Sequence, residues 1–88
     1  MRIYVGNLSP DVTEDELRNA FRVFGQVSFV KISQDLTQDA LTSFGLVGMV
    51  VKLEAKAAIA GLHMSKLKGR AITVNEAGVH SRQSAVSK

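Results

Sequence analysis

The chain contains no cysteine, and its two histidines, His63 and His80, stand far apart. Without thiols, a disulfide framework, a cysteine-based zinc site and thiol catalysis are excluded. Two distant imidazoles make a poor metal site. We therefore expect the protein to work without a metal ion or cofactor.

Long apolar runs are missing as well. No stretch approaches the roughly 20 apolar residues that a transmembrane helix needs. Strand-like sequence begins within two residues of Met1, which leaves no room for a signal peptide. We expect no membrane segment and a cytoplasmic location.

Neither size nor charge decides the function. At 88 residues the chain is long enough for one small domain, which buries roughly 60–65% of its unfolded surface. The net charge of +3 is compatible with binding a polyanion, but so mild an excess is no evidence for one.

The chain does contain one nearly continuous apolar stretch, residues 42–51, which has the length of a strand. Successive side chains of a strand point to opposite faces. The two sets are Gly45, Val47 and Met49 on one face and Phe44, Leu46 and Gly48 on the other. An aromatic ring and a leucine on the second face are unusual if that face meets water. Either helices cover both sides of the sheet, or the second face is a binding surface.

Three more strands and two helices are expected around this stretch. Alternating patterns rich in β-branched and aromatic residues predict strands at residues 2–7, 27–32 and 71–75. Apolar residues at helical spacing predict one helix over 14–24 and another over 53–64.

The first helix has recognisable ends, and polar segments separate the elements. Thr13 and Glu16 fit the two positions of a capping box. Gly25 stands where a residue in the left-handed conformation ends many helices. Residues 33–43 are expected to form a loop, and residues 67–70 a turn.

The order strand–helix–strand, strand–helix–strand predicts an α+β protein with a ferredoxin-like βαββαβ sandwich. In that fold a four-stranded antiparallel sheet carries two helices on one face, so the other face stays open. The second face of residues 42–51 belongs to this open face. The side chains expected on it are Arg2, Tyr4, Phe29, Lys31, Phe44, Leu46, Thr73 and Asn75.

Two stretches of the chain resemble the motifs of the RNA recognition motif family. Residues 3–8 (IYVGNL) match its hexapeptide: an aliphatic, an aromatic, an aliphatic, any residue, then Asn-Leu. Residues 42–49 stand where the family keeps its octapeptide, and Phe44, Gly45 and Val47 match it. The chain looks most like small bacterial proteins that contain a single such domain. The resemblance implies an RNA recognition motif domain at residues 1–76 and leaves residues 77–88 as a disordered C-terminal tail.

The octapeptide also departs from the family pattern. In the family, three exposed aromatic residues stack two or three bases. Here the matching positions keep Tyr4 and Phe44 but have Leu46 in place of the third ring. Met49 replaces the last aromatic, at a position that faces the core. The loop before this strand is usually basic, whereas here it holds Asp35 and Asp39 and no Lys or Arg, so we expect a weak electrostatic share of binding.

The resemblance implies a non-catalytic module that binds single-stranded RNA, with single-stranded DNA as an alternative ligand. Aromatic and apolar side chains would contact bases, cations would contact phosphates, and an amide would hydrogen-bond a base edge. The candidate RNA-binding residues are, in that order, Tyr4, Phe44, Leu46 and Phe29; Arg2, Lys31 and Arg70; and Asn75.

Other interpretations of the same residues stay open. Phe29, Phe44 and Leu46 are also expected to form a hydrophobic patch for a homodimer or another protein partner. Phe29 by itself is equally well explained by packing beneath the neighbouring loop or the tail. A ferredoxin-like enzyme of the acylphosphatase kind is disfavoured, because the sequence has no Gly-rich phosphate loop and no nucleophile–base pair.

Overall fold

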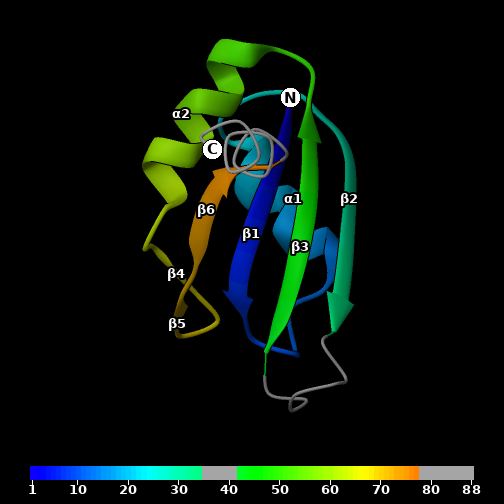
Figure 1. Cartoon of the computed structure of the whole chain (residues 1–88), viewed down its shortest axis with the longest axis vertical. Coiled ribbons are helices and arrows are strands. Elements are labelled where there is room, and N and C mark those ends of the chain that lie inside the picture. The colour runs from blue at the N-terminus through cyan, green and yellow to red at the C-terminus, as the bar shows by residue number, and fades with distance from the viewer. Residues whose placement is uncertain (35–41, 78–88) are drawn as a thin grey trace, which may run out of the picture.

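The structure is a computed structural model, and it describes residues 1–34 and 42–77. Residues 78–88 of the expected tail and residues 35–41 of the expected loop lie outside the described residues. Figure 1 shows the elements, which follow one another as β1 (Arg2–Leu8), α1 (Glu14–Arg22), β2 (Val27–Gln34), β3 (Ser43–Met49), α2 (Lys52–Leu62), β4 (Lys66–Leu67), β5 (Arg70–Ala71) and β6 (Thr73–Glu76).

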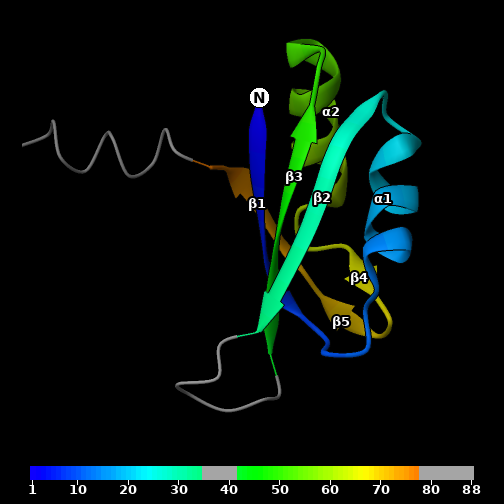
Figure 2. The ribbon, with the colours of Figure 1, turned by 90° about the vertical axis from the view of Figure 1, so that its right-hand side faces the viewer.

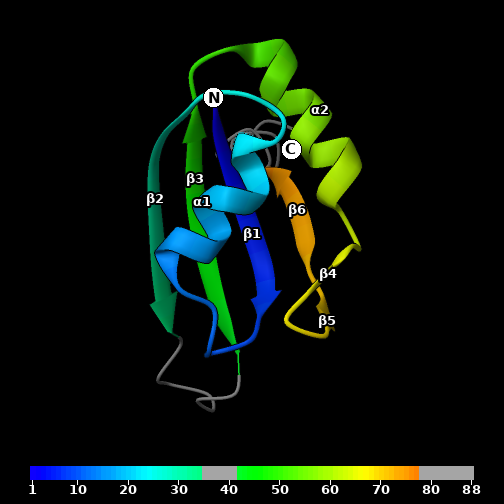
Figure 3. The same ribbon diagram turned by 180° about the vertical axis from the view of Figure 1, so that it is seen from behind.

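Four of the strands form one antiparallel sheet in the order β2-β3-β1-β6. Both helices lie against the same face of this sheet, as the side view and the rear view show (Figures 2 and 3). The predicted ferredoxin-like arrangement is confirmed. The opposite face carries no helix among the residues that the structure describes.

The hydrophobic core lies between the sheet and the two helices. α1 contributes Leu17 and Phe21, and α2 contributes Ala55 and Ala58, none of which has exposed surface. The strands contribute their inward-facing aliphatic residues. Met49 is 1% exposed, so its predicted position in the core is confirmed. The two alanines present little bulk to the sheet, which lets α2 pack closely.

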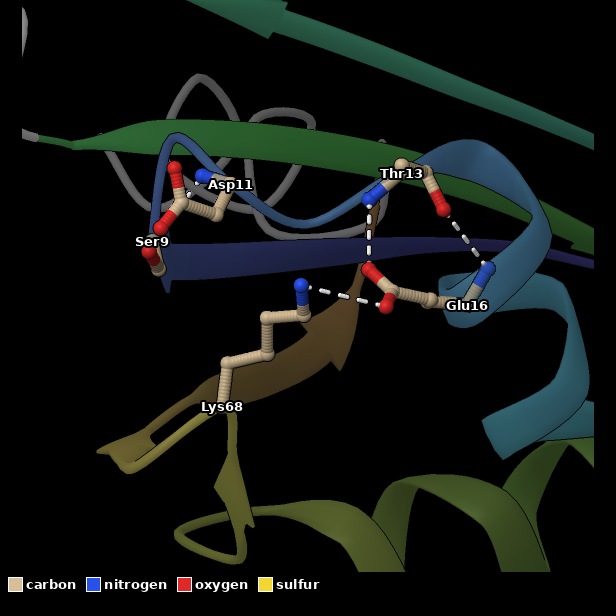
Figure 4. A network of polar contacts seen from close by, with 5 residues as sticks. All are labelled: Ser9, Asp11, Thr13, Glu16 and Lys68. Carbon is tan, nitrogen blue, oxygen red and sulfur yellow. Dashed lines mark hydrogen bonds and ion pairs between the residues drawn. The ribbon is translucent and has the colours of Figure 1, made fainter.

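α1 begins at the predicted capping box. The Thr13 hydroxyl accepts a hydrogen bond from the Glu16 backbone N–H at 3.1 Å, and the Glu16 carboxylate accepts one from the Thr13 N–H at 2.9 Å (Figure 4). The second carboxylate oxygen of Glu16 lies 3.2 Å from the Lys68 Nζ. The Thr13 backbone hydrogen bond, and after it the Lys68 ammonium, lower the pKa of Glu16.

The end of α1 differs from the prediction. The helix stops at Arg22, two residues early, and Gly25 does not have a positive φ, so its predicted role as a left-handed terminator is wrong. Gly25 instead makes room for α2: a Cβ there would lie 2.1 Å from the Glu54 carboxylate. That carboxylate accepts a hydrogen bond from the Gln26 N–H at 3.1 Å. Sequence spacing along one helix does not reveal a contact with the other helix.

β1 is longer than predicted, because it contains a bulge before its end. The pairing with β3 shifts between Val5 and Leu8, and Asn7 adopts a φ of 59°. The extra residue turns Asn7 outward and returns Leu8 to the core, where it is fully buried. The Asn7 side-chain amide then donates to the Ala71 carbonyl at 2.7 Å, which ties the end of β1 to β5.

The predicted turn at residues 67–70 is a two-stranded hairpin, β4–β5. Its two turn residues, Lys68 and Gly69, both have positive φ angles, 53° and 81°, as a tight primed turn requires. Residues 63–65, just before the hairpin, hydrogen-bond with residues 72–74 along the outer edge of β6. Ser65 accepts from the Ile72 N–H at 2.9 Å, and the His63 Nδ1 accepts from the Val74 N–H at 3.0 Å.

Candidate nucleic-acid interface

Alternate residues of the four main strands point away from the helices and form the open face. The register of the sheet arranges their side chains in rows that cross the strands. The rows are Lys31, Leu46, Tyr4 and Asn75 in the centre; Phe29, Gly48 and Arg2 toward the end of β3; and Ser33, Phe44, Gly6 and Thr73 toward its start. All the side chains predicted for the open face lie on it.

Tyr4 and Phe44, here called the aromatic pair, lie together on this face. Their ring centroids are 6.0 Å apart and their planes differ by 26°. The exposed fractions are 41% for Tyr4 and 37% for Phe44. The two rings are stacked, and both remain partly exposed to solvent.

Gly6 allows the Tyr4 ring to approach Phe44. A Cβ at Gly6 would lie 3.1 Å from the Tyr4 Cε2 and 2.6 Å from the Thr73 Oγ1. The tyrosine ring therefore leans along β1 over the glycine, toward the bulge that Phe44 faces across the sheet. Gly6 stands at the hexapeptide position that accepts any residue, and here a glycine leaves room for the Tyr4 ring.

Leu46 occupies the middle of the central row. It is half-buried, and its neighbours across the strands are Tyr4 on β1 and Lys31 on β2. Asn75 lies beyond Tyr4 on β6 and is exposed. One row therefore offers a cation, an apolar surface, an aromatic ring and an amide in sequence across the sheet.

The candidate cations do not all lie on the open face. Arg2 and Lys31 are exposed there. Arg70 lies at the end of the sheet, half-buried, with its NH1 group 3.4 Å from both the Leu8 carbonyl and the Thr42 hydroxyl. The guanidinium therefore connects the hairpin to the end of β1 and to the residue before β3.

Two serines on this surface were not predicted from the sequence. The second strand was predicted to end at residue 32, whereas β2 runs to Gln34 and places Ser33 opposite Phe44. Ser28 was not predicted either, because nothing in the alternating pattern marks the bulge that lies between Val27 and Phe29 in the pairing with β3.

Within residues 1–34 and 42–77, no group of three His, Asp or Glu side chains is placed to hold a metal ion. Neither α1 nor α2 is long and apolar enough to cross a membrane.

The family model described as the RNA recognition motif matches residues 3–73. The chain belongs to the RNA recognition motif family. The match spans β1 to the start of β6, so the aromatic pair and the central row of the open face up to Tyr4 lie inside this RNA recognition motif domain.

Individual relatives agree with the family assignment. "Glycine-rich RNA-binding protein 1" of Mycosarcoma maydis is 41% identical over 76 residues, which make up 86% of this chain but 43% of that protein. "Putative RNA-binding protein RbpE" of Nostoc sp. is 37% identical over 87 residues, 99% of this chain and 88% of that protein. The predicted resemblance to small bacterial proteins with a single RNA recognition motif is confirmed.

A solved structure shows the same fold. The crystal structure of "RNA Binding Protein PG1" superposes with a TM-score of 0.78 at 33% identity, over 89% of this chain and 94% of that one.

Proposed function

We propose that this protein binds single-stranded RNA on the open face of its sheet and catalyses no reaction. The observation that carries the proposal is the aromatic pair, two near-parallel rings exposed on a sheet face that no described helix covers. A base stacked on such a ring contributes about 1–3 kcal/mol of binding free energy. The names of the two similar proteins, both given as RNA-binding, support the proposal.

The surrounding side chains have separate roles in this proposal. Arg2 and Lys31 contact phosphates on either side of the bound strand, and Arg70 contacts it at the end of the sheet. Asn75 hydrogen-bonds the edge of the base that lies on Tyr4. Leu46 supplies apolar contact between the ring of Tyr4 and the stem of Lys31.

Stacking alone does not distinguish RNA from DNA, because both present the same π faces. Single-stranded DNA is therefore a second ligand to test, and the RNA 2′-hydroxyl is the group that would separate the two. The cytoplasmic location expected from the sequence remains a prediction.

The proposal is tested by titrating the protein with a pool of short single-stranded RNAs and following backbone amide NMR shifts. Shifts centred on β1 and β3 are expected, and Tyr4→Ala and Phe44→Ala should each weaken binding by about 1–3 kcal/mol. Val23→Ala, which removes an exposed aliphatic side chain at the end of α1, is the control and should bind as the wild type does.

A sedimentation measurement on the free protein completes this test. If RNA does not bind and a stable dimer covers the aromatic pair, the open face is a protein interface and the proposal is wrong. If RNA binds with equal affinity in both alanine variants, the bound strand lies elsewhere on the molecule.

A further inference from the structure

A bulge in β2 lies directly before Phe29, which faces the open side of the sheet. Val27 pairs with Met49 and packs against the core, whereas Phe29 pairs with Gly48, so Ser28 is an extra residue between them. In a regular strand Phe29 would lie on the same face as Val27. Because of the bulge, Val27 faces the core while Phe29 lies on the open face with Lys31, and the extra residue Ser28 is exposed between them.

The glycine opposite this bulge provides the space for the ring. A Cβ at Gly48 would lie 2.3 Å from the Phe29 Cε2, 2.5 Å from its Cδ2 and 2.7 Å from the Ser28 Oγ. One edge of the ring therefore lies over the backbone of β3. The Phe29 side chain thus points inward across the sheet and away from the outer edge of β2. Arg2 lies on the other side of Gly48, as its partner on β1.

The Phe29 ring and the Ser28 hydroxyl thus lie close to Gly48, and the exposed Arg2 is the partner of this glycine on β1. We call the cluster of Ser28, Phe29 and Arg2 around Gly48 the Gly48 subsite. The bulge in β2 adds the Ser28 hydroxyl to the cluster, and the absence of a side chain at Gly48 leaves room for the Phe29 ring.

The Gly48 subsite is separate from the aromatic pair. Gly48 and Phe44 lie four residues apart on β3, which is roughly 13 Å along the strand. A single base cannot cover both places. Leu46, halfway between them, offers an apolar surface over which the strand can pass.

We propose that the Gly48 subsite binds a further nucleotide of the strand whose other bases stack on the aromatic pair. The base lies on the exposed side of the Phe29 ring, the Arg2 guanidinium contacts a phosphate, and the Ser28 hydroxyl hydrogen-bonds the sugar or the base. This inference rests on the proposed RNA binding. It adds that affinity rises further once the strand is long enough to reach the Gly48 subsite as well as the aromatic pair.

The test compares Phe29→Leu with the wild type on single-stranded oligouridylates of increasing length, from two to six nucleotides, by NMR titration. Leucine keeps an apolar cover over Gly48 but has no π face. The variant should bind the dinucleotide as the wild type does and should bind the hexanucleotide roughly 5- to 150-fold more weakly, the loss of one stacked base. Val23→Ala should match the wild type at every length. Gly48→Ala, whose added methyl group displaces the ring, should behave like Phe29→Leu.

Each outcome decides between the two proposals. If the wild type binds no oligouridylate and no oligonucleotide of mixed sequence, the proposed RNA binding is wrong. If Tyr4→Ala weakens binding at every length while Phe29→Leu follows the wild type at every length, RNA binding stands and the Gly48 subsite does not exist. If Phe29→Leu loses affinity equally for the dinucleotide and the hexanucleotide, or loses it together with thermal stability, the role of Phe29 is structural and the inference is again overturned.

Discussion

Leu46 is the residue where the open face offers least to a nucleic-acid base. It lies half-buried in the central row, next to Tyr4, and presents methyl groups where a ring would present a π face. Apolar contact with a base is retained, but the stacking contribution is lost. The open face therefore holds its aromatic surface at two separated places, the aromatic pair and Phe29.

Leu46→Phe should strengthen binding of single-stranded RNA by up to about 1–3 kcal/mol, because it adds one stacking surface. The melting temperature should change little, since the position is on the open face and the larger ring does not enter the core. Both quantities should be measured on this one variant. A lower melting temperature with unchanged affinity would show that the side chain at 46 packs as part of the fold and takes no part in binding.

Ser43 lowers the stability of the fold, because its hydroxyl is buried without a hydrogen-bond partner among the described residues. Its side chain is on the core side of β3 and is 1% exposed. A buried hydroxyl without a partner destabilises the folded state, because it loses its hydrogen bonds to water and forms none within the protein.

Ser43→Ala should therefore raise the free energy of unfolding, by about 1 kcal/mol in a urea titration. Ser33→Ala is the matched control: Ser33 is exposed on the open face of β2, so its unfolding free energy should stay within about 0.5 kcal/mol of the wild type. Loss of stability in Ser43→Ala would mean that the hydroxyl is hydrogen-bonded in solution.

At the scale of the elements, local patterns predicted the helices and strands well. The alternation in residues 42–51 gave both faces of β3 correctly, and the capping box gave the start of α1 at Thr13. These features depend on residues that are neighbours in the chain, so their physics is visible in the sequence.

The features that the sequence did not reveal all involve contacts between distant segments. The bulges at Asn7 and Ser28 depend on which strand lies alongside. The first returns Leu8 to the core, and the second lets Val27 face the core although Phe29 faces outward. The role of Gly25 likewise depends on the Glu54 carboxylate from α2. On the candidate site, the alternating pattern predicted the aromatic pair, Phe29 and Arg2 on the open face, but not Ser28 or the close approach of the Phe29 ring to Gly48.

The start of α1 makes part of the stability depend on pH. The pKa of Glu16 is lowered in the folded protein, first by the Thr13 N–H and then by Lys68, relative to a usual value of 4.5. Because the folded-state pKa is below the unfolded one, this contribution is complete above pH 4.5 and is lost as the pH falls through the folded-state value.

Glu16→Gln should therefore make the unfolding free energy less dependent on pH in the acid range, measured by urea titrations between about pH 6 and pH 3. Glutamine can still cap the helix, so α1 should persist. Lys68→Ala removes only the ion pair and should give an intermediate pH dependence. Identical acid profiles for wild type and Glu16→Gln would show that the carboxylate does not couple to folding.

At the scale of the whole molecule, positive charge is spread over both sides. Arg2 and Lys31 are on the open face, whereas Lys56 is exposed on α2 on the opposite side. Only cations that touch the nucleic-acid backbone release counterions when the strand binds. The dependence of affinity on salt therefore reports which side of the protein binds.

With two or three phosphate contacts, log K should fall against log salt with a slope of about −1.5 to −2, from about −0.7 per contact on a single strand. Lys31→Ala should make this slope shallower by about 0.7. Lys56→Ala removes the same charge from the helical side and should leave the slope unchanged. The reverse result for the two variants would place the nucleic acid on the helices.

The strand order has a consequence for how the chain is made. β1 lies between β3 and β6, so one of its two partners consists of residues 73–76. Between the synthesis of Leu8 and that of Glu76, translation at about 5–20 residues per second takes roughly 3 to 14 s. Throughout that interval one edge of β1 has no neighbour, and the nascent chain is open to cleavage and to mispairing. Protease resistance of ribosome-stalled chains should therefore rise only once β6 has left the exit tunnel, and resistance gained with β3 alone would show that the sheet is stable before its last strand arrives.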